Sequence, residues 1–285
     1  MRDGSGTIGA RLQSVTERFK TLGAADPARD ALLIVAHVLD KDPSRLRMML
    51  DEPISDDYLG FGAGSYYTEV LKSYEDGKPI SKIIGKRAFW KDDFYVNEDV
   101  LDPRPDTERL IEIAIEAPFS RVLDLGTGSG CILISLLREQ RDALGVGVDV
   151  SDAALDVARR NSTTLGAENA EWTLSDWYKN VEGDFDLIVS NPPYIAANEM
   201  AGLASNVRNF DPEISLTDGA DGLTCYRIIC AGSPKHLRNQ GRLIVEIGPT
   251  QADEVRTMFV QAGLANVQVF QDLDGRDRIV SGFKD

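Results

Sequence analysis

Residues 121–137 read RVLDLGTGSGCILISLL, with two apolar runs on either side of a glycine-rich turn. The first run predicts a buried strand over 121–125, and the second predicts the opening turns of a helix. Glycine lets the backbone come close to a ligand. A strand, a glycine loop at 126–130 and a helix in this order predict an α/β domain that binds a nucleotide or nucleoside at the loop.

An acidic residue follows the next predicted strand. Asp149 comes directly after the run at 144–148, where a carboxylate can accept hydrogen bonds from two ribose hydroxyls. A dinucleotide-binding fingerprint would have Gly or Ala at position 131, where this chain has Cys131. The loop therefore favours a nucleoside ligand over NAD.

The tetrapeptide Asn191-Pro192-Pro193-Tyr194 follows an apolar run at 185–190 that predicts another buried strand. Its prolines have no amide hydrogen and hold the segment extended, which leaves carbonyl groups free to face a ligand. The Asn191 side-chain oxygen and the Pro192 carbonyl can accept both hydrogens of a substrate NH2 group and aim its lone pair at a methyl donor, beside the aromatic wall of Tyr194. Alone, the tetrapeptide is also compatible with a plain strand-ending turn. Together with the glycine loop it indicates methyl transfer to nitrogen.

Length and composition indicate a globular enzyme with two domains. The chain has 285 residues, of which 42% are hydrophobic and 27% are charged. Its apolar runs are too short to cross a bilayer and residues 1–6 do not resemble a signal peptide, so we expect a cytoplasmic protein. The two histidines and three cysteines show no metal-ligand spacing, and we expect no metal.

The formal net charge of −15 at pH 7 bears on the substrate. Enzymes that methylate exocyclic amines of DNA share the Asn/Asp-Pro-Pro-Tyr motif, but they neutralise phosphates with Lys and Arg. A local basic patch is compatible with an acidic chain, so the charge disfavours a nucleic-acid substrate without excluding it. We expect a protein substrate, and no direct binding to nucleic acid or to membrane.

Apolar stripes at helical spacing occupy residues 1–80 and predict a small helical bundle. Asp26 and Pro27 predict the start of one helix, and a short helix is expected over 44–50. We interpret the bundle as a substrate-recognition domain, with a purely stabilising appendage as the alternative. Residues 81–105 carry turn residues around an aromatic run and predict a β-hairpin linker.

Residues 106–285 alternate predicted strands and helices, which indicates a mainly parallel, doubly wound sheet. Asp106 is the predicted N-cap of the helix that carries Leu110. A strand is expected from Arg242 to Ile247. The last two predicted strands, near 267–270 and 278–280, should add an antiparallel strand.

Ligands of such sheets bind at the carboxyl ends of the strands. Trp177, after the third strand of this domain, is expected to stack on adenine while Asp176 accepts the adenine amino group. The candidate cofactor-binding residues are Asp124, Gly126, Thr127, Gly128, Ser129, Gly130, Asp149, Asp176, Trp177 and Asn191.

The chain resembles the HemK/PrmC family, whose members methylate the glutamine of the Gly-Gly-Gln motif in peptide-chain release factors. The resemblance covers almost the whole chain. It rests on PRPDTE at 103–108, DLGTGSG at 124–130, SDW at 175–177, SNPPYI at 190–195, residues 207–212, and EIG at 246–248 with Gln251.

The resemblance implies a Rossmann-like class I methyltransferase domain and a helical domain that helps to dock the release factor. It implies S-adenosyl-L-methionine as the cofactor, with S-adenosyl-L-homocysteine as the product, and places Asp124 near the methionine end and Asp149 at the ribose. The implied catalytic residues are Asn191, Pro192 and Tyr194. The implied substrate-binding residues are Asn191, Pro192, Pro193, Tyr194, Arg104 and Pro105.

The chain departs from the family pattern at Lys82, Asp102 and Asp211. These positions bear on how the substrate docks rather than on methyl transfer. Two other functions stay open at this point: a nucleic-acid N-methyltransferase, and a catalytically silent module that binds S-adenosylmethionine. The identity of the purified substrate that accepts a labelled methyl group would separate the first from a protein methyltransferase, and any turnover would exclude the second.

Overall fold

The structure is a computed structural model, and it describes residues 6–54 and 65–285. The chain forms two compact units that divide between Lys86 and Arg87. This boundary lies inside the segment predicted as a linker, 81–105. The start of that segment belongs to the first unit, and its hairpin belongs to the second.

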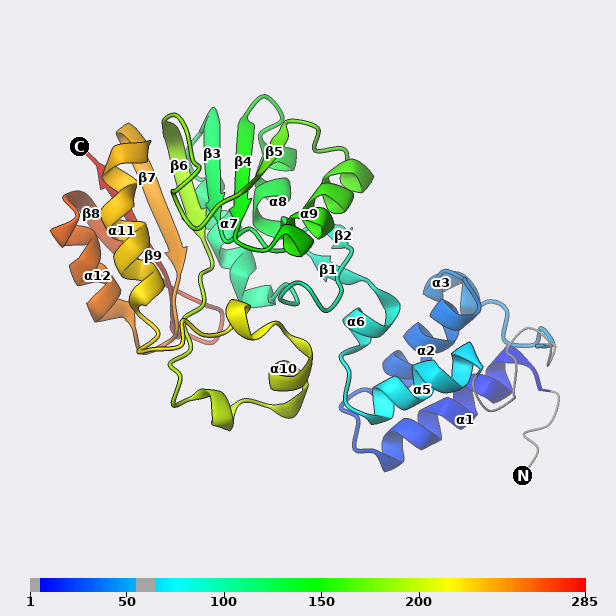
Figure 1. The fold of residues 1–285 in the computed structure, drawn as a ribbon. Helices are drawn as coiled ribbons and strands as arrows, with labels where there is room; N and C mark the ends of the chain where they lie inside the picture. Colours follow the sequence, from blue (N-terminus) through cyan, green and yellow to red (C-terminus); the bar gives the residue numbers. More distant parts are fainter. Residues whose placement is uncertain (1–5, 55–64) are drawn as a thin grey trace. The chain divides into compact units, whose positions relative to one another are not determined.

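The first unit is a helical bundle, as predicted (Figure 1). Its described helices are α1 (Ile8–Thr21), α2 (Pro27–Val38), α3 (Pro43–Leu46), α5 (Tyr66–Glu75) and α6 (Ile80–Ile84). The side chain of Asp26 caps α2 by accepting a hydrogen bond from the Arg29 amide at 3.1 Å, which confirms the predicted start. In the core of the bundle, the buried ring of Phe19 stacks on Tyr74 with the centroids 3.8 Å apart.

The helix predicted over 44–50 is shorter than expected, because α3 ends at Leu46. Leu46 is fully buried, whereas Met48 is 80% exposed and Leu50 is 42% exposed. The segment after Leu46 therefore lacks the continuous apolar face that stabilises a helix in a protein.

The predicted hairpin is present at the start of the second unit. It consists of β1 (Arg87–Phe89) and β2 (Asp92–Phe94), which pair antiparallel. The Trp90 amide donates to a carboxylate oxygen of Glu108 at 2.8 Å. This bond fastens the hairpin to the first turn of α7 (Glu108–Ile115).

The second unit contains a seven-stranded sheet in the order β5-β4-β3-β6-β7-β9-β8. Its strands are β3 (Arg121–Leu125), β4 (Leu144–Asp149), β5 (Ala170–Leu174), β6 (Phe185–Ser190), β7 (Leu237–Glu246), β8 (Leu264–Gln271) and β9 (Asp277–Lys284). Neighbouring strands are parallel except where β9 pairs antiparallel with β7 and β8, as the sequence predicted. The strand expected to begin at Arg242 begins earlier, at Leu237, because Leu237 pairs with Phe185 before a shift in register.

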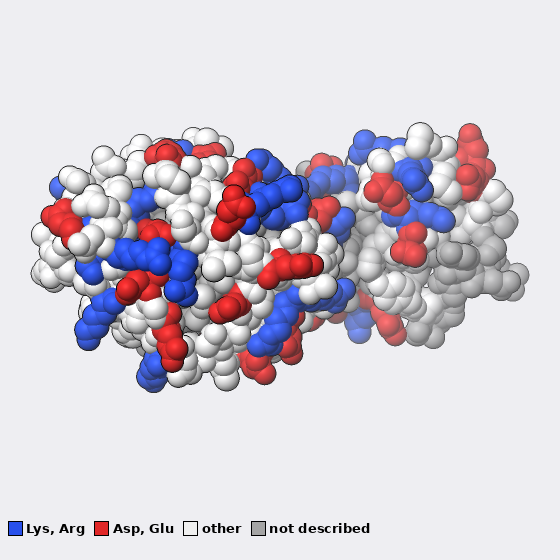
Figure 2. Space-filling model, turned by 90° about the horizontal axis from the view of Figure 1, so that it is seen from above, with Lys and Arg blue, Asp and Glu red and all other residues white. Residues whose placement is uncertain are grey.

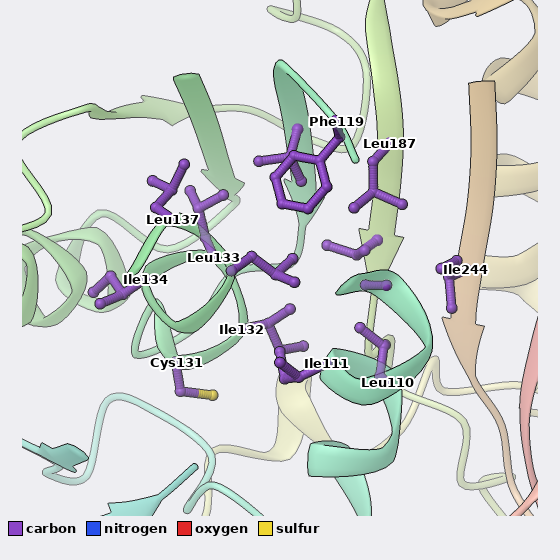
Figure 3. Packing of buried hydrophobic residues seen from close by; sticks show 14 of the residues in the cluster. Leu110, Ile111, Phe119, Cys131, Ile132, Leu133, Ile134, Leu137, Leu187 and Ile244 are labelled. Atoms are coloured by element: carbon purple, nitrogen blue, oxygen red, sulfur yellow. The ribbon is translucent and has the colours of Figure 1, made fainter. Parts of the chain in front are cut away.

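Helices pack on both faces of the sheet, which makes it doubly wound. The helices are α7, α8 (Cys131–Glu139), α9 (Asp152–Leu165), α11 (Thr224–His236) and α12 (Ala252–Gln261). Side chains alternate along a strand, so Val122 packs with residues of α7 and α8, whereas Leu123 packs with residues of α11 and α12. Figure 3 shows the first of these clusters, with α7 and α8 packed on Leu187 and Ile244.

The prediction that Asp106 caps α7 is wrong. Asp106 lies within a 3-10 turn, Pro105–Thr107, and Thr107 stands at the cap position without a capping side-chain bond. The Asp106 carboxylate instead lies 3.4 Å from the Arg278 guanidinium. The polar side chains of this turn therefore contact strands of the sheet instead of capping α7.

One further segment contributes to the region around this turn. Between β6 and α11 the chain forms η2 (Met200–Gly202), α10 (Ser205–Phe210) and η3 (Glu213–Ser215). The buried guanidinium of Arg242 donates to the carbonyls of Ala114 at 2.6 Å and Ala117 at 3.0 Å. Arg242 thus satisfies carbonyls at the end of α7 and ties that helix to β7.

Candidate active site

The glycine loop lies at the carboxyl end of β3, as predicted. Gly126, Gly128 and Gly130 all have positive φ, at 71°, 53° and 77°. A side chain at Gly130 would also meet the Trp172 ring, because a Cβ there would lie 2.9 Å from it. The amides of Gly126 and Thr127 both donate to the Val148 carbonyl at 2.9 Å, which holds the loop against the end of β4. Glycine is therefore required by the backbone conformation of this loop.

Two carboxylates, Asp124 and Asp149, lie at the ends of β3 and β4 beside the loop. One Asp124 oxygen accepts from the Thr127 hydroxyl at 2.6 Å, while its other oxygen is buried without a partner. Burial raises the pKa of Asp124 to about 7. Asp149 accepts from the Gly128 amide at 2.9 Å and from the Ser151 amide at 3.0 Å, and burial raises its pKa as well.

The next strand end carries Trp177 and Asp176. The Trp177 ring lies beside the glycine loop, 4.0 Å from the position of a Cβ on Gly126, and its backbone has a positive φ of 54°. Asp176 forms an ion pair with Lys179 at 2.6 Å and is about half exposed. The structure therefore brings Trp177 to the loop, while the Asp176 carboxylate already has a cationic partner.

The Asn191 side chain is held by two residues that the sequence analysis did not assign to the site. Its amide nitrogen donates to the Thr107 hydroxyl oxygen at 3.1 Å, and that hydroxyl donates to Glu246 at 2.6 Å. Because the amide nitrogen is engaged in this way, the Asn191 oxygen remains the group available as an acceptor.

The rest of the tetrapeptide is fixed through its backbone. The Gln251 side-chain nitrogen donates to the Tyr194 carbonyl at 2.9 Å, and its oxygen accepts from the Gly248 amide at 2.9 Å. Pro192 is buried and Pro193 is half-buried. The segment that carries Asn191 is therefore anchored at both ends, by β6 before it and by Gln251 after it.

A cavity of about 280 Å³ opens beside Asn191. Its lining combines the tetrapeptide, the 3-10 turn and the segment between β6 and α11: Leu101, Arg104, Pro105, Asp106, Asn191, Tyr194, Ile195, Val207, Ser215, Leu216 and Glu246. Arg104 forms an ion pair with Asp211 at 2.8 Å. Of the predicted substrate-binding residues, Asn191, Tyr194, Arg104 and Pro105 line this cavity.

Glu246 is the most unusual group in the cavity wall, because its side chain is only 1% exposed. Burial raises the pKa of Glu246 to about 7, against the opposing effects of the Thr107 hydrogen bond and the Arg278 charge. One signal in the sequence could have identified it: an acidic residue at the end of the apolar run LIVE, at 243–246. An ionisable group in such a place is costly unless it has partners.

Among residues 6–54 and 65–285, no group of three or more His, Cys, Asp or Glu side chains is arranged to hold a metal ion. In the same part of the chain, none of the helices has both the length and the apolar composition needed to cross a bilayer.

Comparisons with known proteins match both units. Residues 11–85 match the PrmC N-terminal domain, and residues 99–207 match the methyltransferase small domain. A release factor glutamine methyltransferase of Cereibacter sphaeroides is 46% identical, with 95% of this chain and 96% of the relative covered. A protein of the same name from Rhodospirillum rubrum is 40% identical, with 95% of this chain and 83% of the relative covered.

A solved structure gives independent support for the fold. The crystal structure of a methyltransferase from Pyrococcus furiosus superimposes with a TM-score of 0.54 at 16% identity, covering 76% of this chain and 97% of that one. At this level of identity the similarity concerns the fold alone. The full-length similarity to the bacterial relatives is stronger, and it shows that the chain belongs to the family of release factor glutamine methyltransferases.

Proposed function

We propose that this chain transfers a methyl group from S-adenosyl-L-methionine to the side-chain amide nitrogen of a glutamine, the one in the Gly-Gly-Gln motif of peptide-chain release factors. The observation that carries the proposal is the orientation of Asn191 beside the cavity. Its nitrogen is bonded to Thr107, which leaves its oxygen as an acceptor for a substrate N–H group.

An amide nitrogen is a poor nucleophile because its lone pair is delocalised into the carbonyl group. Acceptors fixed on both N–H groups help to align that lone pair with the methyl donor, and we assign this role to the Asn191 oxygen and the Pro192 carbonyl. Gln251 adds rigidity, since it bonds the Tyr194 carbonyl. After transfer the nitrogen releases one proton, so the product is a neutral N-methyl amide.

The residues at the strand ends fit the methyl donor. One Asp124 oxygen is buried without a partner, so we assign it to accept a hydrogen bond from the cofactor, and we assign Asp149, which accepts from the Gly128 amide of the loop, to the ribose hydroxyls. Trp177 offers an aromatic face beside Gly126. When bound, S-adenosylmethionine supplies a methyl group on a positively charged sulfur, which takes the bonding electron pair and leaves as S-adenosylhomocysteine.

A nucleic-acid substrate is less well supported. The chain carries a net charge of −15 at pH 7, and on the face shown in Figure 2 the basic and acidic side chains are interspersed. Phosphate backbones require a concentrated positive surface. The cavity beside Asn191 has apolar walls contributed by Leu101, Val207 and Leu216, which suit the methylenes of a glutamine side chain.

The division of labour between the units is part of the proposal. We assign residues 1–80 to recognition of the release factor, residues 81–105 to the linker, and residues 106–285 to catalysis. All the proposed cofactor contacts come from the second unit. Because its partner acts in translation, we place the protein in the cytoplasm.

The test is to incubate the full chain with a purified release factor and radiolabelled S-adenosylmethionine, and to map the methylated residue by mass spectrometry. Methylation at the Gly-Gly-Gln glutamine supports the proposal, whereas label found only in added DNA or RNA contradicts it. Asn191→Ala should lower the single-turnover rate by on the order of 10²-fold, far more than it lowers cofactor affinity. A near wild-type rate in this variant would remove Asn191 from the reaction.

A further inference from the structure

The buried chain of hydrogen bonds from Glu246 through Thr107 to Asn191 has a direction. Glu246 and Thr107 are 1% and 2% exposed, so solvent does not supply them with alternative partners. The two bonds are 2.6 Å between the Thr107 and Glu246 oxygens and 3.1 Å between the Asn191 nitrogen and the Thr107 oxygen. The hydroxyl in the middle has a single hydrogen to donate.

An ionised Glu246 carboxylate can only accept hydrogen bonds, so the Thr107 hydroxyl must donate to it. The Thr107 oxygen then can only accept from Asn191, which must turn its NH2 group toward Thr107 and its oxygen away. A protonated Glu246 removes this constraint, because the acid can donate to Thr107 and free its hydrogen for the Asn191 oxygen. Asn191 could then reverse and present a donor to the substrate N–H groups.

We propose that ionised Glu246, acting through the Thr107 hydroxyl, fixes the amide orientation of Asn191, and that methyl transfer is lost when Glu246 takes up a proton. Glu246 and Thr107 are thus positioning residues, since neither needs to touch the reacting atoms. The inference rests on the proposed function, because the assay is glutamine methylation.

The groups around Glu246 place its pKa in a range of pH that an activity assay can cover. Burial, and to a smaller extent the nearby Asp106 carboxylate, raise the pKa of Glu246 to about 7, against Thr107, Arg278 and Tyr194, which favour the charged form. Tyr226 of α11 and Cys131 of α8 also face Glu246, and burial keeps both of them neutral because it raises their pKa values. The required state is the charged one, so activity is present above the Glu246 pKa and falls as the pH drops through it.

Asp124 could produce a similar acid limb, because burial raises its pKa to about 7 as well. The test must therefore separate the two carboxylates. Asp124 lies beside the glycine loop, so its protonation should act on cofactor binding. Measurement at saturating S-adenosylmethionine, with a direct titration of cofactor affinity at each pH, isolates the contribution of Glu246.

The experiment is a single-turnover pH profile on an intact release factor. The wild-type rate should fall by about tenfold for each pH unit below the midpoint. Glu246→Gln mimics the protonated acid, since it is neutral and can both donate and accept, so its rate should be about tenfold or more lower above the midpoint and show no acid limb.

Three companion variants separate positioning from a general loss of structure. Thr107→Val removes the hydroxyl that links Glu246 to Asn191, and it should lower the single-turnover rate. Thr107→Ser keeps this hydroxyl, so it should retain most of the wild-type rate together with the acid limb. Tyr226→Phe removes a hydroxyl that donates to the Glu246 backbone carbonyl at 2.9 Å, so it perturbs the same residue without touching its carboxylate. It should retain the acid limb at the wild-type midpoint.

A second readout does not depend on activity. The side-chain NH2 signal of Asn191, followed by isotope-edited NMR in the free protein, should shift with the same midpoint as the rate and stay constant in Glu246→Gln. An acid limb that persists in Glu246→Gln, or an Asn191 signal that does not titrate, would overturn the inference. Absence of methylation by the wild-type chain at any pH would instead refute the proposed function.

Discussion

Gln251 is the residue whose replacement most directly tests whether the tetrapeptide must be held rigidly. Its nitrogen donates to the carbonyls of Tyr194 at 2.9 Å and Gly222 at 3.2 Å, and its oxygen accepts from the Gly248 amide at 2.9 Å. Gln251→Met keeps the length of the side chain and removes these three bonds, together with a longer one of 3.5 Å that the Gln251 oxygen accepts from the Tyr226 hydroxyl. The perturbation is therefore confined to the anchoring of the segment.

The expected size of the effect follows from these three bonds. Each neutral hydrogen bond contributes roughly 0.5–1.5 kcal/mol net, so the loss of three should destabilise the second unit by about 1.5–4.5 kcal/mol. A displacement of about 1 Å in a positioning group can lower a rate by on the order of 10²-fold. We expect Gln251→Met to lower the single-turnover rate by tenfold or more. Affinity for S-adenosylmethionine should change little, because the three bonding partners lie outside the glycine loop and Asp149.

Gln251→Glu is the matched control. It keeps an oxygen for the Gly248 amide but directs a second oxygen at the carbonyls of Tyr194 and Gly222. The pKa of the introduced carboxyl should be raised by this environment, so the melting temperature of the variant should recover toward wild type as the pH falls. Calorimetry and thermal melts measure both effects. A Gln251→Met variant with a wild-type rate and a lowered melting temperature would show that Gln251 contributes to folding alone.

Three further outcomes are expected. Asp149→Ala should raise the dissociation constant of S-adenosylmethionine by about tenfold or more, because a charged acceptor is lost, and unchanged affinity in a calorimetric titration would remove Asp149 from the cofactor site. Gly222→Ala should lower methylation more than cofactor binding, because φ is +76° there and a Cβ would collide with the Tyr194 carbonyl oxygen; equal losses in the two measurements would contradict this. A chain of residues 87–285 that first shows a cooperative melt should keep its cofactor affinity and methylate a short Gly-Gly-Gln peptide, yet lose most activity on the intact release factor. Equal activity of truncated and full chains on the intact factor would make the first unit a stabilising appendage.

Much of the fold could be predicted because local patterns and packing agree in the second unit. The runs at 121–125 and 185–190 are strands with the predicted bounds, since each is a short segment bordered by turn residues. The position of the glycine loop could also be predicted, because its backbone conformation favours glycine at Gly126, Gly128 and Gly130, where φ is positive.

The failures around the candidate site concern residues whose partners are distant in the sequence. Asp106 has the residue type of a helix cap, but Arg278, more than a hundred positions away, takes its carboxylate. Thr107 and Glu246 are separated by 139 positions, and their hydrogen bond depends on how the 3-10 turn Pro105–Thr107 packs against the end of β7. Local sequence preferences contain no information on such pairs. The hydrogen bonds that run from Glu246 through Thr107 to Asn191 could therefore be identified only in the folded structure.

The reversed strand β9 has a consequence for the order in which this protein can be built. Among the described residues, β8 bonds to the sheet only through β9, although β8 precedes β9 in the chain. During synthesis β8 must therefore wait, with an unpaired edge, until residues 277–284 have emerged and inserted beside β7. Arg278, which faces Glu246 and Asp106, arrives with that strand. A nascent chain that ends before residue 277 would lack the cation beside Glu246, so the surroundings of this carboxylate are complete only once β9 has joined the sheet.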